Sequence, residues 1–149
     1  MQSARSTSTH ALRITRTFPA SVDRVFAAFT EPDLLKQWWG PAGFSLPSAT
    51  VDLRVGGRYR FGMQPPQGEV MYLVGTFREI DRPRRLIYTW AWEGAPQSES
   101  LVTIDLREVD GDTEVVITQQ PFADERTRIE HVKGWEGGLD RLQSVLRRT

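Results

Sequence analysis

Apolar and polar positions alternate with a period of two near the start of this chain. Leu12, Ile14 and Phe18 fall on one face of the alternating segment, which is typical of a half-buried strand. In residues 22–29 the apolar side chains follow the helical spacing instead, which predicts a short amphipathic helix. The same spacing returns from Pro32, so a second short helix is expected directly after the first.

The residues around these two helices fit their ends. Ser21 suits the capping position of the first helix, because its hydroxyl can accept a hydrogen bond from a free backbone N–H. Pro32 suits a first helical turn, and the Gly40-Pro41 pair cannot continue a helix. The sequence therefore predicts a two-helix insert after the first strand.

From Ser48 to Gln120 the period of two returns, and turn residues recur closely enough for consecutive antiparallel strands. The first of these strands is expected to run through Val55 to a hairpin turn at Gly56-Gly57, and Asp110-Gly111 marks a later hairpin. Counting the first strand, about seven strands are expected. One strand has a strongly aromatic face, formed by Leu86, Tyr88, Trp90 and Trp92.

A single long helix is predicted from Asp124 to Arg148. Its apolar stripe places Trp135 toward the sheet, and its basic end complements the negative end of the helix dipole. A curved antiparallel sheet with helices on one face is an α+β arrangement. The stripe consists of Val132, Trp135, Leu139, Leu142 and Leu146, and the basic residues are Arg141, Arg147 and Arg148.

Three glycines interrupt this long helix. Gly134, Gly137 and Gly138 each cost about 1 kcal/mol relative to alanine in a helix interior, so something offsets them. Close approach to the sheet, or a kink, is one explanation. Space for a ligand beside Trp135 is the other, and the sequence leaves both open.

Charge and composition narrow the range of partners. The 19 Lys and Arg residues balance 19 Asp and Glu residues, so there is no global field to attract nucleic acid or an anionic membrane. Without cysteine the chain forms no disulfide and no thiolate metal site. No stretch has the length and apolarity of a membrane span, so membrane insertion is not expected.

The first residues are polar and rich in Ser and Thr, and they lack the apolar run of a secretory signal. Residues 1–11 are therefore predicted to be a disordered N-terminal tail, and residues 12–149 a single domain. The chain is expected to be cytoplasmic.

Four segments resemble the Aha-type family (activator of heat-shock-protein ATPase homologue-like) of the START-like, or SRPBCC, superfamily. They follow in the order of the family and together cover nearly the whole chain beyond the tail. The segments are ITRTFPASVDRVFAAFTEPDLLKQWWGPAGF, VDLRVGGRYRFGM, RPRRLIYTWAWE and HVKGWEGGLDRL. The resemblance implies a helix-grip fold, in which the curved sheet wraps around the C-terminal helix and encloses a cavity that accepts apolar molecules in many relatives.

The aromatic strand faces opposite the glycine-containing helix, together with this resemblance, leave three hypotheses for the function. The first is non-catalytic binding of a small apolar or aromatic molecule in the cavity, without a cofactor. The second is a cyclase or hydrolase type of enzyme that uses a pocket acid or base. The third is a chaperone-interacting domain with a role in the stress response. Besides the small molecule, the partners considered are a chaperone and a second copy of this chain. The residues expected to contact a ligand are Trp38, Trp39, Tyr59, Phe61, Met63, Tyr88, Trp90, Trp92, His131 and Trp135.

His131 is the one histidine within the predicted domain. It lies one helical turn before Trp135, and its unperturbed pKa would suit a general base. No sequence motif, however, identifies a carboxylate that orients it. No cluster of ligands has the spacing of a metal site either, so no metal is predicted.

Two pairs of charged residues invite a catalytic interpretation. Asp52 and Arg54 point the same way along a strand, and Glu136 and Asp140 are four apart on the long helix. Both pairs also fit an ordinary solvated surface. The sequence alone favours the surface interpretation.

Overall fold

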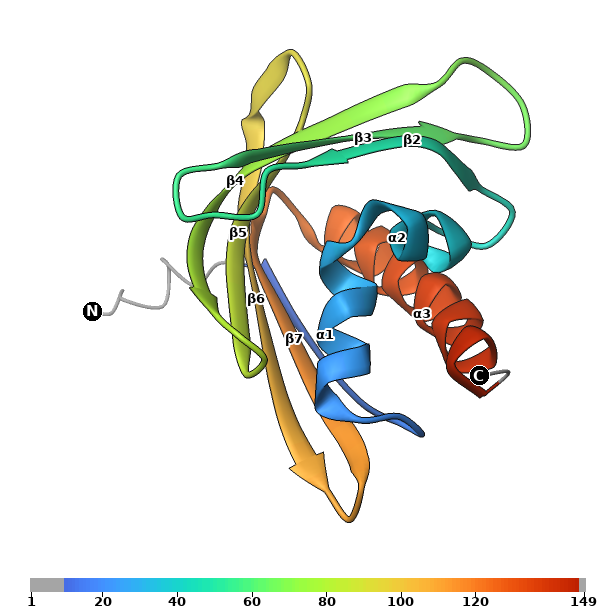
Figure 1. Cartoon of the computed structure of the whole chain (residues 1–149). Coiled ribbons are helices and arrows are strands. Elements are labelled where there is room, and N and C mark those ends of the chain that lie inside the picture. The colour runs from blue at the N-terminus through green and yellow to red at the C-terminus, as the bar shows by residue number, and fades with distance from the viewer. Residues whose placement is uncertain (1–9, 148–149) are drawn as a thin grey trace.

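A computed structural model describes residues 10–147, and its single antiparallel sheet curves around the helices (Figure 1). The seven strands are ordered β1-β7-β6-β5-β4-β3-β2. α3 lies in the concave side of the sheet, with α1 and α2 beside it. The elements are β1 (His10–Phe18), α1 (Val22–Thr30), α2 (Pro32–Trp38), β2 (Ser45–Val51), β3 (Arg58–Gln64), β4 (Met71–Asp81), β5 (Arg85–Trp92), β6 (Ala95–Val109), β7 (Asp112–Phe122) and α3 (Glu125–Arg147).

The predicted order of elements is confirmed, and so are several of the predicted ends. Ser21 Oγ accepts a hydrogen bond from the backbone N–H of Arg24 at 3.3 Å, which caps α1. Asp110 and Gly111 both have positive φ angles, as a tight hairpin turn between β6 and β7 requires. The sequence pattern was therefore sufficient to place most turns.

The end of β2 differs from the prediction. The strand ends at Val51 instead of continuing through Val55, because the chain then folds back on itself. Arg54 N–H donates to the carbonyl of Asp52, and Gly57 N–H donates to the carbonyl of Arg54. Val55 is consequently 63% exposed, although it continues the alternation of the strand.

The start of the domain also differs from the prediction. Residues 10 and 11, which were expected in the tail, are the first two residues of β1, and His10 pairs with Phe122 of β7. The rest of the predicted tail, residues 1–9, lies outside the described residues. Pairing with β7 extends the ordered strand, because each added residue satisfies backbone hydrogen bonds.

α3 supplies the central side of the apolar core. Leu139 and Leu142 are fully buried against the sheet, and Trp135 is 8% exposed, so the predicted phase of the helix is confirmed. The helix begins where Asp124 Oδ1 accepts from the backbone N–H of Thr127 at 2.8 Å. Within residues 10–147, no helix is long and apolar enough to span a membrane.

Arg141 has a different role from the one predicted for it. Its guanidinium lies away from the end of α3 and donates to the backbone carbonyls of Trp38, Gly40 and Pro41. Two of these distances are 3.0 Å, to Trp38, and 3.2 Å, to Pro41. Arg141 therefore satisfies the carbonyls at the end of α2 and joins that segment to α3.

Arg141→Met should lower the free energy of unfolding by about 2 kcal/mol, because it removes charge-assisted hydrogen bonds from half-buried carbonyls. Arg147→Met is the matched control, since Arg147 is exposed in the last turn of the same helix. Urea unfolding of the two variants measures the difference. Equal losses in both variants would contradict the role given to Arg141.

Candidate ligand-binding cavity

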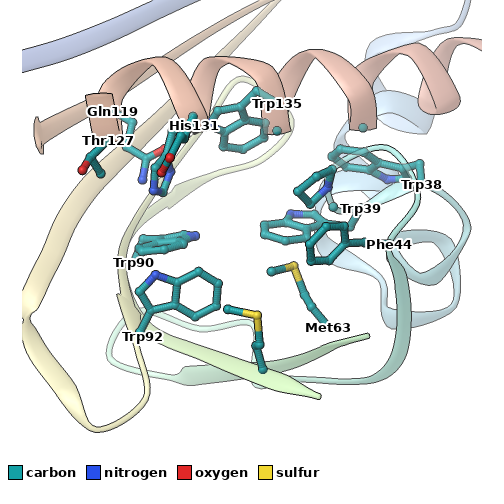
Figure 2. Close-up of a pocket in the computed structure, with 16 residues that line it drawn as sticks. Trp38, Trp39, Phe44, Met63, Trp90, Trp92, Gln119, Thr127, His131 and Trp135 are labelled. Carbon is teal, nitrogen blue, oxygen red and sulfur yellow. Dashed lines mark hydrogen bonds between the residues drawn. The ribbon is translucent and has the colours of Figure 1, made fainter. Parts of the chain in front are cut away.

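A cavity of about 410 Å³ lies between α3, the segment after α2, and strands β3 and β5 (Figure 2). The chain has five tryptophans, and all five line this cavity. They come from three separate parts of the fold, so folding is required to bring them together. The tryptophans are Trp38, Trp39, Trp90, Trp92 and Trp135.

Two of these indoles are fixed by hydrogen bonds within the protein. Trp38 Nε1 donates to the carbonyl of Ala28 in α1 at 2.9 Å. Trp135 Nε1 donates to Gln119 Oε1 at 2.9 Å, and Gln119 Nε2 donates in turn to Ser100 Oγ at 2.8 Å. Because Gln119 is fully buried, this chain of bonds holds the Trp135 ring in one orientation.

The other three indole N–H groups, those of Trp39, Trp90 and Trp92, have no hydrogen-bond partner among the described residues. Their rings are held by aromatic contacts instead. Trp39 meets Trp135 edge to face at 6.3 Å, and Trp90 meets Trp92 edge to face at 5.0 Å between ring centroids. These three rings therefore line the cavity with indole N–H groups that form no hydrogen bond to the described part of the protein.

The far end of the cavity from His131 is apolar. Figure 2 shows Met63 and Phe44 beside Trp39 at that end, with the sulfur of Met63 directed into the space. Met71 lines the cavity from β4 and is 40% exposed. Thioether and aromatic side chains of this kind adapt to flat apolar ligands.

His131 lies at the other end and packs between two aromatic rings. Its imidazole is 4.7 Å from the Trp90 ring and 4.7 Å from the Phe122 ring, measured between centroids. Burial lowers the pKa of His131, and the neighbouring carboxylate of Glu130 acts in the opposite direction. The imidazole is therefore neutral near neutral pH.

Seven of the ten predicted contact residues lie in the cavity lining, and three do not. Tyr59, Phe61 and Tyr88 pack with Phe77 in a separate aromatic cluster, where the remaining void is only about 10 Å³. Tyr59 Oη donates to the carbonyl of Thr89 at 2.6 Å, and burial raises the pKa of both tyrosines. Trp39 lies between this cluster and the cavity, because it lines both spaces and meets Phe61 edge to face at 5.3 Å, which strand alternation alone could not predict.

Several lining residues were missed by the sequence analysis. Gln119 had a signal, because it occupies an inward position of β7 that continues the apolar face of Val115 and Ile117. A polar residue in such a position indicates a buried polar contact. The others lie in loops, at the start of β4 or on the face of α3, without such a signal: Gly40, Pro41, Phe44, Met71, Thr127 and Glu130.

Two of the three glycines of α3 allow close approach, but to the segment after α2 and not to the sheet. A Cβ on Gly137 would lie 2.8 Å from the backbone nitrogen of Ala42, and one on Gly138 would lie 3.1 Å from the carbonyl oxygen of Gly40. Gly134 and Gly138 also line the cavity. The close approach therefore occurs at Gly137 and Gly138, but its partner is the segment after α2 and not the sheet that the sequence suggested.

The two charged pairs lie outside the cavity lining. Arg54 Nε pairs with Asp52 Oδ2 at 2.9 Å on the surface. Glu136 and Asp140 both pair with Arg16 of β1, at 3.2 Å and 2.7 Å. The pairs with Arg16 connect α3 to the edge of the sheet, and the pair of Asp52 with Arg54 is local, so neither needs a catalytic role.

No metal centre is formed in the described part of the chain. Residues 10–147 contain no group of three His, Cys, Asp or Glu side chains close enough to hold a metal ion. The cavity lining contains only His131 and Glu130 of these types, and Glu130 is 66% exposed. The donor set therefore suits an organic molecule better than a metal ion.

The chain belongs to the family of activator of Hsp90 ATPase homolog 1-like proteins, because the model of that family matches residues 19–147. The predicted family and the START-like helix-grip fold are both confirmed by this match and by solved structures. No match was found among curated proteins. Membership supports cavity binding in general terms and does not identify a ligand.

Solved structures from several bacteria are similar over most of their length. A protein from Chromobacterium violaceum is 26% identical with a TM-score of 0.85, and the match covers 92% of this chain and 96% of that one. The AHSA1 protein from Silicibacter pomeroyi is 26% identical with a TM-score of 0.80, covering 92% and 97%. CalU16 from Micromonospora echinospora is 29% identical with a TM-score of 0.67, covering 89% and 73%.

Two glycine substitutions in α3 should have opposite effects. Gly134→Ala should stabilise the protein by up to about 1 kcal/mol, because its Cβ would make only ordinary contact with Pro41 at 3.4 Å. Gly137→Ala should destabilise it by about 1–3 kcal/mol, because the new Cβ overlaps the backbone of Ala42. Thermal unfolding of both variants checks the contrast, and stabilisation by both would contradict the close approach at Gly137.

The lowered pKa of His131 predicts a pH dependence of stability. The folded state binds this proton more weakly than the unfolded state, so stability is lost as pH falls below about 6.5. His131→Phe keeps a ring in the same place and should remove this part of the loss. Unfolding free energies of both proteins between about pH 7.5 and about pH 5 test it, and parallel curves would contradict it.

Proposed function

We propose that this protein binds a small apolar or aromatic molecule in the cavity between the sheet and α3, without catalysing a reaction on it. The observation that carries the proposal is the cavity of about 410 Å³ whose lining contains every tryptophan of the chain. A protein interior normally closes such a space, because an unfilled void forfeits packing contacts.

The size and lining of the cavity support this function. Its volume falls in the range of about 300–1,000 Å³ that is usual for small-molecule sites. The lining is dominated by aromatic and thioether side chains, with a few polar groups near His131. Such sites take their affinity from apolar burial and their selectivity from the few polar groups.

The arrangement of the titratable groups favours binding over an enzyme of the cyclase or hydrolase type. His131 packs against the rings of Trp90 and Phe122, and no carboxylate among the described residues forms a hydrogen bond that would orient it as a base. Glu130, the adjacent carboxylate, lies 3.7 Å from Arg126 on the exposed side of α3.

A chaperone-interacting role and a homodimer remain predictions. The first rests on the family name, and the second has no particular surface to support it in the described residues. A pull-down with chaperones would address the first separately from ligand binding. The cavity is therefore the basis of the proposed function.

Filling part of the cavity should weaken binding. Met63→Trp places an indole ring where the Met63 sulfur now enters the space. Affinity for small aromatic compounds should therefore fall at least about tenfold, while the melting temperature should not fall. Ligand-observed NMR with a panel of neutral aromatic compounds measures the affinity.

Val55→Trp is the matched control for this experiment. It adds the same indole at a loop position that is 63% exposed and outside the cavity lining, so binding should be unchanged. Unaltered binding by the Met63 variant, or no binding by the wild-type protein to any compound of the panel, would contradict the proposed function.

A further inference from the structure

The indole N–H of Trp90 is an unused hydrogen-bond donor that faces the cavity. In residues 10–147, every fully buried side-chain nitrogen or oxygen has a hydrogen-bond partner. Trp90 Nε1 has no such partner, so this nitrogen is not fully buried. Because the whole Trp90 side chain is only 5% exposed, the space that the nitrogen faces is the cavity. Figure 2 shows this nitrogen directed toward the cavity.

His131 places an unused donor and an unused acceptor beside Trp90. A neutral imidazole carries one N–H and one nitrogen that accepts. The described residues provide no hydrogen bond to either nitrogen, and the ring lies 4.7 Å from Trp90 between centroids. Figure 2 shows the imidazole on the same side of the cavity as Trp90.

The charges around the cavity do not suit an anionic ligand. No Lys or Arg is among the residues that line it. The lining carries one carboxylate, Glu130, whose side chain is 66% exposed. A ligand carboxylate or phosphate would therefore lose water without gaining a cation, and Glu130 would repel it.

We propose that the cavity selects an uncharged aromatic compound that carries a hydroxyl group. The hydroxyl oxygen accepts a hydrogen bond from Trp90 Nε1, and the hydroxyl proton is donated to the accepting nitrogen of His131. The aromatic ring lies toward Met63 and Phe44. This inference rests on the proposed function, because it names the ligand class of the same cavity.

A hydroxyl group fits these two residues better than an ether does. An ether oxygen accepts from Trp90 but offers no proton to the accepting nitrogen of His131. A hydroxyl satisfies both groups at once, and the aromatic part buries the apolar end of the cavity. Each group left unpaired on ligand entry would instead cost free energy of desolvation.

The test compares three naphthalene derivatives with the full-length protein near neutral pH, by equilibrium dialysis. 2-Naphthol carries the hydroxyl, 2-methoxynaphthalene keeps the oxygen but lacks the proton, and 2-naphthoate carries a negative charge. 2-Naphthol should bind about tenfold more tightly than 2-methoxynaphthalene, which corresponds to one hydrogen bond. 2-Naphthoate should bind most weakly.

Substitutions then assign the preference to its residues. His131→Phe keeps a ring at the same place but removes the acceptor, so 2-naphthol should fall to the affinity of 2-methoxynaphthalene. Trp90→Phe removes the donor and should weaken both compounds. Ile129→Phe adds the same ring at a position of α3 that is 41% exposed and outside the lining, so the ratio should stay unchanged.

The outcomes separate this inference from the proposed function. Equal affinity for 2-naphthol and 2-methoxynaphthalene, or a preference that persists in His131→Phe, would overturn the hydroxyl site and leave cavity binding intact. Tightest binding of 2-naphthoate would overturn the inference in favour of an anion site. No binding of any of the three compounds would overturn both proposals. The wild-type comparison holds even if a variant fails to fold.

Discussion

Backbone contact between α3 and the segment after α2 is the constraint on which the cavity depends. Gly137 allows α3 to approach Ala42 more closely than any side chain would permit, and Arg141 holds the carbonyls of Trp38, Gly40 and Pro41 from the same helix. This contact fixes the distance between α3 and the segment after α2 at one end of the cavity. The aromatic side chains can then line a space without collapsing into it, because the backbones that carry them are already in contact and cannot move closer.

The cavity has two ends of different chemistry that arise from this arrangement. At one end, Met63 and Phe44 provide an apolar surface, and at the other, His131 and Trp90 present polar atoms that the protein leaves unpaired. Gln119 accepts a hydrogen bond from the indole N–H of Trp135, so that donor is used within the protein. The indole N–H of Trp90 has no such partner among the described residues and stays available to a ligand. A binding site needs this combination, in which apolar area gives affinity and a few directed groups give selectivity.

The fold could be predicted from the sequence because its signals are local. Helical and strand periods, the Ser21 cap and the Asp110-Gly111 turn each depend on a few neighbouring residues. The site was harder to predict, because it depends on which side chains from distant segments pack against each other. Tyr88 and Trp90 lie on one face of β5, yet Tyr88 packs into a closed aromatic cluster and Trp90 lines the cavity. The bonding role of Arg141 was also missed, since it joins segments that are far apart in the chain.

Xenon under pressure tests the central claim, an unfilled apolar space bounded by the tryptophans, most directly. Xenon enters apolar cavities that are large enough to hold it and is visible in crystals by its scattering. The account predicts a xenon atom between Met63 and Trp92, and none in the void of about 10 Å³ beside Tyr59. Crystals in which side chains of α3 and β5 meet across this space, with no xenon between them, would contradict it.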